Sequence, residues 1–199
     1  MSAFTRLIPV FTLLAFLGAG LTACASRPAS DFAAATPELV LEEFFPGRTV
    51  AYGIFEDRFG DLRRRFRVEI DGRMQDGDLI LDERFIYDDG EQQQRIWTIT
   101  PSRAADGSRL YQGRAADVIG LADGSAAGPA LNWSYEVGLA IGGRIWEVRF
   151  DDWIYQLDEN VALNRARVSK WGIELGTVTL VFLRGAAAAA IPPLNLESW

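Results

Sequence analysis

The chain has 199 residues, a formal net charge of −7 at pH 7, one cysteine and no histidine. An acidic chain does not bind nucleic acid through bulk electrostatics, so we expect no nucleic-acid partner. Without imidazole the commonest general bases and zinc ligands are missing, and a metal would need a site made of oxygen atoms alone. We therefore expect no metal, no cofactor and no catalytic residue.

The N-terminus has the features of a bacterial lipoprotein signal. Arg6 precedes an apolar run of 14 residues, from Leu7 to Gly20. Such a run is too short to cross a bilayer as a helix but is typical of the core of a secretory signal. Small residues stand directly before Cys24, as in a lipobox. We predict that residues 1–23 are a signal peptide and that lipid is attached to Cys24; the alternative is a cleaved signal that leaves a free thiol.

The residue after the cysteine bears on the location of the mature protein. Ala25 stands where an aspartate would signal retention in the inner membrane of many species. We therefore expect an outer-membrane lipoprotein that faces the periplasm and has the membrane as a partner through its anchor at Cys24. Lipid on the sulfur leaves no thiol, which excludes a disulfide or a redox role for the mature chain.

The sequence divides into a folded domain and two flanking segments. Residues 24–37 are rich in Ala, Ser and Pro and lack an apolar period, so we predict a lipidated tether. "TPELVLEEFF" predicts one short helix, with Thr36 as N-cap and Pro37 at its first position. Residues 185–199 are low in complexity and contain two prolines, so we expect a flexible tail outside the fold. Residues 38–184 remain as the folded domain.

Apolar and polar residues alternate through this domain. In "RRRFRVEI" the residues Phe66, Val68 and Ile70 share one face, and "LNWSYEVGL" and "RIWEVRF" have the same two-residue period. Turn signals such as "DG", "DDGE" and "GG" separate the runs. We predict an all-β domain of eight to ten antiparallel strands, closed as a barrel or packed as a sandwich. The glycine-rich residues 113–130 indicate strands or loops that backbone or ligand approaches closely, or a flexible loop.

Four successive stretches carry a family resemblance: "LEEFFPGRTVAYGIFEDRFGDLRRRF", "LDERFIYDDGEQQQRIWTIT", "GRAADVIGLADGSAAGPALNWSYEV" and "VRFDDWIYQLDENVALNRARVSKWGIELGTVTLVF". The blocks "RFDDWIY" and "NRARVSKWG" are the most distinctive. Over about residues 41–183 the chain resembles the bacterial lipoprotein family called domain of unknown function 3833. The resemblance implies a lipobox anchor and a lipocalin-like barrel, and it brings no catalytic residues.

Three polar features are candidates for chemistry. Asp151 and Asp152 are neighbours on a predicted strand, so their side chains point to opposite faces and cannot form a catalytic pair. We expect one to be solvated and the other to accept hydrogen bonds or to pair with an arginine such as Arg165. Lys170 is the only lysine, which we interpret as a preference for arginine rather than as a Schiff-base nucleophile. The arginines at 63–67 are split between two faces, which favours a solvated strand over a site for lipid phosphates.

The aromatic residues are the remaining signal. Facing a barrel interior, they would line an apolar pocket with a few polar handles; the alternative is that they fill the barrel. We rank binding or transfer of a lipid, such as a fatty acid, or of another apolar small molecule first. A non-catalytic protein that docks another envelope protein comes second, and a lipid-modifying enzyme third. We expect Arg165 or Lys170 near one end of the interior as the partner of an acidic head group. The predicted ligand-binding residues are Trp97, Trp133, Tyr135, Asp152, Trp153, Tyr155, Arg165 and Lys170.

Overall fold

The computed structural model describes residues 27–141 and 143–199. The predicted signal peptide and the lipidation site at Cys24 lie outside the described residues. Within the described ranges, no helix is long and apolar enough to cross a membrane.

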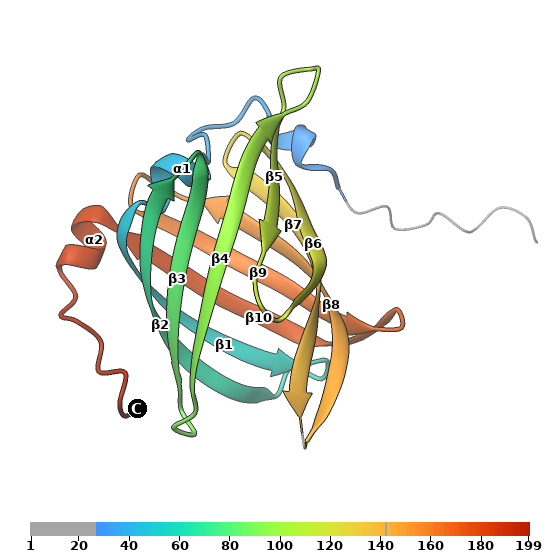
Figure 1. Cartoon of the computed structure of the whole chain (residues 1–199), viewed down its shortest axis with the longest axis vertical. Helices are drawn as coiled ribbons and strands as arrows, with labels where there is room; N and C mark the ends of the chain where they lie inside the picture. Colours follow the sequence, from blue (N-terminus) through green and yellow to red (C-terminus); the bar gives the residue numbers. More distant parts are fainter. Residues whose placement is uncertain (1–26, 142) are drawn as a thin grey trace, which may run out of the picture.

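Ten antiparallel strands form one closed barrel, in which each strand pairs with its neighbour in the chain and β1 pairs with β10 (Figure 1). Short turns between strands of alternating polarity favour this up-and-down order. The predicted all-β domain of eight to ten strands is therefore confirmed. Because the ladder closes within residues 47–184, a chain that starts after Cys24 contains the whole barrel. The strands are β1 (Gly47–Asp57), β2 (Leu62–Gln75), β3 (Asp78–Tyr87), β4 (Gln92–Arg103), β5 (Arg109–Arg114), β6 (Val118–Ala127), β7 (Ala130–Ile141), β8 (Arg144–Gln156), β9 (Val161–Lys170) and β10 (Ile173–Arg184).

A short helix, α1 (Leu41–Phe44), closes one end of the barrel (Figure 1). Both of its apolar residues are buried, and the ring of Phe45 packs edge-on against Phe182 of β10 with centroids 5.2 Å apart. The hydroxyl of Tyr111, a fully buried residue of β5, accepts the backbone N–H of Leu41 at 3.3 Å. This end of the barrel is therefore packed, and we call it the closed end.

The predicted start of this helix is wrong. The N-cap residue is Val40, which is extended and makes no side-chain capping bond, so Thr36 is not the cap. The backbone N–H of Leu39 instead donates to the carbonyl oxygen of Gly128 in the β6–β7 turn at 2.8 Å. That long-range bond keeps the chain extended, and the helix begins at Leu41.

Part of the predicted tether packs on the outer wall of the barrel. The 3₁₀ helix η2 (Ala29–Phe32) contacts β6 and β7. The centroid of the Phe32 ring lies 6.0 Å from that of Trp153 and 5.9 Å from that of Tyr155. The tether predicted to extend to residue 37 is therefore shorter, because one aromatic residue in an otherwise small and polar stretch provides the contact.

The C-terminal segment also lies against the barrel. The helix α2 (Gly185–Ala189) contacts β1 and β10, and the chain after it continues along the outside of the barrel (Figure 1). The guanidinium of Arg48 donates to the carbonyl oxygen of Ile191 at 3.0 Å and also pairs with Glu69. The expectation that residues 185–199 lie outside the fold is wrong, because their backbone carbonyls satisfy a half-buried arginine, which composition does not reveal.

Candidate functional site

A cavity of about 520 Å³ occupies the barrel interior. It extends from Phe45 at the closed end to Glu91, Gln93 and Trp146 at the opposite ends of the strands. Those three side chains are exposed to solvent, so the cavity opens there, and we call this end the mouth. Small-molecule sites have volumes of roughly 300 to 1,000 Å³, and this cavity falls within that range.

The wall of the cavity is mostly apolar because alternate residues of each strand point inward. On β10, Val178, Leu180 and Phe182 line the cavity and the residues between them do not. One side of the wall is aromatic: Phe150 stacks on Tyr135 with ring centroids 5.2 Å apart. An apolar molecule inside would therefore contact aliphatic side chains on one side and flat rings on the other.

Asp152 of β8 is a polar group in this wall, and its side chain is buried. The hydroxyl of Tyr135 donates to one carboxylate oxygen at 3.1 Å, and the amide of Asn164 donates to the other. Burial raises the pKa of Asp152 to about 6, and the hydrogen bonds from Asn164 and Tyr135 oppose that rise. Burial also raises the pKa of Tyr135 well above its ordinary value, so its hydroxyl remains a donor.

Glu83 of β3 and Arg95 of β4 are paired in register and both border the cavity. Burial within the barrel raises the pKa of Glu83 to about 7, although the charge of Arg95 favours the carboxylate. Glu83 keeps part of its surface accessible because it faces the cavity. Arg95 forms an ion pair with Asp117 in the β5–β6 loop, and its Nη2 and Nε donate to Oδ2 at 2.6 and 3.1 Å. Within residues 27–141 and 143–199, Glu83 makes no ion pair within 4.0 Å.

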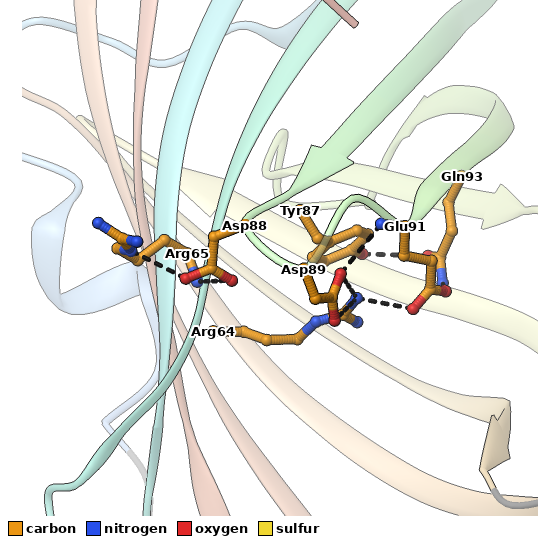
Figure 2. Close-up of polar contacts among 7 residues, drawn as sticks. All are labelled: Arg64, Arg65, Tyr87, Asp88, Asp89, Glu91 and Gln93. Carbon is orange, nitrogen blue, oxygen red and sulfur yellow. Dashed lines mark hydrogen bonds and ion pairs between the residues drawn. The ribbon is translucent and has the colours of Figure 1, made fainter. Parts of the chain in front are cut away.

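Arg64 of β2 lines the cavity at the mouth, and Figure 2 shows its contacts with the β3–β4 turn. Its Nη2 donates to Asp89 at 2.8 Å and to Glu91 at 2.6 Å, both in the β3–β4 turn. Its guanidinium carbon lies 3.7 Å from the centroid of the Tyr87 ring. The positive charge of Arg64 is thus neutralised by two carboxylates and is not free for a ligand.

Two glycines provide the space for Trp133. A Cβ atom on Gly113 of β5 would lie 2.6 Å from Cζ2 of Trp133, and one on Gly124 of β6 would lie 2.2 Å from Cε3. Any side chain at either position would displace the indole. The close approach of backbone predicted within residues 113–130 is confirmed at Gly128, where an added Cβ would lie 2.0 Å from the carbonyl oxygen of Phe32. At Gly113 and Gly124 the approaching group is an aromatic side chain.

The structure brings half of the predicted binding residues to the cavity. Trp97, Trp133, Tyr135 and Asp152 line it. The rings of Trp97 and Tyr135 meet edge-on with centroids 5.4 Å apart, so residues of β4 and β7 form one aromatic wall.

Trp153, Tyr155 and Arg165 lie on the outer face, which corrects the expectation that they face inward. Trp153 directly follows the inward-facing Asp152 on one strand, so it must point outward. Arg165 is the register partner of Trp153 and therefore shares its face. Lys170 lies at the mouth, where its Nζ is 4.5 Å from the ring centroid of Trp146, a lining residue.

The two adjacent aspartates point to opposite faces, as predicted. On the outer face, Asp151 accepts a hydrogen bond from the Asn132 amide at 2.9 Å, whereas Asp152 faces the cavity. They form no catalytic pair. The predicted hydrogen-bonded carboxylate is Asp152, and its partners are Tyr135 and Asn164 rather than an arginine.

Among the polar residues of the cavity that were missed from the sequence are Glu83, Arg95 and Asn164. Each stands two positions from an apolar inward residue, and strand periodicity applied to polar residues would have identified them. Within the described parts of the chain, no cluster of three or more acidic, cysteine or histidine side chains is arranged to hold a metal ion.

Comparisons with known proteins bear on the fold and the family. The family model described as "Protein of unknown function (DUF3833)" matches residues 18–184. Among solved structures, an S-type phycobiliprotein lyase from Guillardia theta is similar, with 9% sequence identity, a TM-score of 0.51, and coverage of 74% of this chain and 93% of that chain. No curated protein matches significantly. The lipocalin-like barrel is thereby confirmed, whereas identity this low transfers no activity.

Proposed function

The chain belongs to the DUF3833 family, and we propose that it binds or transfers a lipid or another apolar small molecule in the cavity of its barrel. The observation that carries this proposal is the interior cavity of about 520 Å³ with its apolar and aromatic wall. A small barrel filled by its own side chains would leave no such space. The buried polar groups of the wall provide the few orienting contacts that small-molecule sites have.

The charges around the cavity favour one kind of ligand polar group. Arg64 is neutralised by the β3–β4 turn and Arg95 by Asp117, while Glu83 and Asp152 make no ion pair with a described residue. The middle of the cavity therefore repels a carboxylate and favours a hydroxyl, amide or ammonium group that donates hydrogen bonds.

The proposed location rests on the predicted lipid anchor. A lipid anchor at Cys24 would hold the barrel at the outer membrane, facing the periplasm, where it would meet ligands that have left a bilayer. We assign it binding and transfer without catalysis. The residues that would contact the ligand are those of the aromatic wall together with Glu83 and Asp152.

A pair of neighbouring residues on β10 gives a direct test. Val178 lines the cavity and is partly accessible, whereas Thr179 points to the outer face of the same strand. In a chain of residues 25–199, Val178→Trp should reduce binding of the neutral fluorescent probe N-phenylnaphthylamine at least about tenfold by filling the cavity. Thr179→Trp adds the same ring outside and should leave the affinity unchanged.

A second measurement tests the polarity of the site. A fluorescent fatty alcohol should bind more tightly than the fatty acid of the same chain length above about pH 7, where Glu83 and Asp152 are ionised.

Equal loss of probe binding in both tryptophan variants, or unchanged binding in both, with the fold intact by circular dichroism, would refute the cavity as the binding site.

A further inference from the structure

The turns around the mouth carry large apolar side chains in full contact with solvent. Trp171 is 89% exposed in the β9–β10 turn, Phe59 76% in the β1–β2 turn, and Ile145 68% next to the β7–β8 turn. These three hairpins belong to neighbouring strands, and the backbone N–H of Arg58 joins two of them by donating to Leu175 of β10 at 3.0 Å. The exposed side chains therefore form one group at one side of the mouth.

Trp171 occupies a position that a hairpin normally gives to another residue. It has φ 52° and Gly172 has φ 77°, and the flanking Lys170 and Ile173 are register partners. A two-residue turn with both φ values positive favours Asn-Gly, and a bulky residue there costs stability. Because the ring is 89% exposed, it packs against almost nothing in the described parts of the chain, and folding does not explain its presence. A strained residue with an exposed aromatic ring indicates a contact outside the chain.

The exposed rings of Phe59 and Trp171 each have a cation beside them. The guanidinium carbon of Arg58 lies 4.8 Å from the centroid of the Phe59 ring, and Nζ of Lys170 lies 4.8 Å from that of Trp171. Neither cation makes an ion pair within 4.0 Å with a carboxylate of the described residues. Tryptophan beside lysine is the composition found where proteins meet the boundary between lipid tails and headgroups.

Several carboxylates of the same end are already paired with arginines. Arg64 and Arg65 hold the acidic β3–β4 turn, the latter through Asp88 at 2.9 Å (Figure 2). Arg63 holds Asp57 of the β1–β2 hairpin at 2.6 Å. Among the described residues, Arg58 and Lys170 thus remain without an ion pair, whereas the acidic turns beside them are held by arginines. This distribution suits a surface of anionic phosphates.

We propose that the mouth docks on a lipid bilayer, with Phe59, Ile145 and Trp171 inserted at the headgroup boundary and Arg58 and Lys170 on the lipid phosphates. Docked in this way, the opening of the cavity faces the bilayer, and an apolar molecule passes between them without crossing water. The docking proposal rests on the exposed turns and not on the cavity, so it can be tested independently of ligand binding.

The test uses residues 25–199 and flotation with vesicles of phosphatidylethanolamine containing phosphatidylglycerol. Trp171→Asn creates the favoured Asn-Gly turn, so this variant should fold at least as stably as the parent. Together with Phe59→Ser it should lower vesicle affinity at least about tenfold, because the variant lacks both rings that would be buried at the headgroup boundary. Leu157→Ser removes a side chain that is 58% exposed near the closed end and should change nothing.

The second part of the test concerns the charge of Lys170. Lys170→Gln should weaken binding to vesicles with phosphatidylglycerol about fivefold and leave binding to pure phosphatidylcholine unchanged. The proposal is overturned if the parent chain does not float with vesicles, or if the double variant floats as the parent does. It is equally overturned if the mouth substitutions abolish self-association or capture of a protein while vesicle binding persists, because the surface would then be a protein interface.

Discussion

Replacement of Glu83 by glutamine should stabilise the barrel at alkaline pH and not at acid pH. The pKa of this carboxyl is raised by burial from 4.5 to about 7, so between those values the folded chain holds a proton that the unfolded chain has released. The free energy of unfolding therefore falls as the pH rises through this range. A shift of this size lowers the free energy of unfolding of the parent chain by about 3 kcal/mol as the pH rises. The variant does not show this fall, because glutamine stays neutral. Solvent in the cavity makes this an upper value.

The assay is urea unfolding of residues 25–199 and of the Glu83→Gln variant at about pH 4 and pH 8. The difference in free energy of unfolding between the two chains should grow by up to about 3 kcal/mol in favour of the variant as the pH rises. Glu136→Gln changes an exposed carboxyl on β7 and serves as the control. A difference that does not change with pH would show that Glu83 is solvated as in water, and the charge argument for the ligand would fail with it.

Three further changes test other parts of the structure. Gly124→Ala places a methyl group 2.2 Å from Trp133 and should lower the free energy of unfolding by about 1–3 kcal/mol in urea, whereas Ser125→Ala on the same strand should not. Arg48→Ala leaves Glu69 without its cation and should cost about 2 kcal/mol, less than a fully buried pair because Arg48 is 33% exposed, and should expose the C-terminal segment to limited proteolysis. Cys24→Ser should move the protein from the outer-membrane fraction to a soluble or unprocessed form; a variant that still fractionates with that membrane at high salt would contradict the lipid anchor.

The architecture was predictable because the two-residue period is local. Phe66, Val68 and Ile70 show it without any long-range information, and closely spaced turns then lead to hairpins and a closed barrel. The inward direction of Trp133 and the opposite faces of Asp151 and Asp152 follow from the same alternation.

The errors arose where the alternation was not applied or where a distant contact decides. Trp153 and Tyr155 have the chemistry of a binding wall, but they stand one and three positions after Asp152 and therefore face outward, where Phe32 packs against them. The path of residues 185–199 depends on Arg48, more than a hundred residues earlier in the chain. Raised pKa values are equally hidden from sequence, because Glu83 acquires its environment from strands that meet only in the barrel.

The position of the N-terminus relative to the mouth leads to a last prediction. Phe32 packs against the C-terminal part of β8, near the closed end. Arg27 follows Cys24 by three residues, and three residues span at most about 11 Å. The barrel is roughly 30 Å long, since its strands have about 12 residues and tilt. With lipid on Cys24 and Phe32 held against the barrel wall, we expect the closed end to stay near the anchoring bilayer and the mouth to dock on a different one.

The lipidated protein in one population of vesicles should therefore capture a second population that carries a different fluorescent label. Trp171→Asn combined with Phe59→Ser should abolish capture while leaving the anchor in place, and the unlipidated chain should bind vesicles singly without bridging them. If the lipidated protein binds its own vesicles through the mouth and captures no others, then residues 27–40 must leave the barrel wall, and the contacts of Phe32 with Trp153 and Tyr155 would be the ones that open.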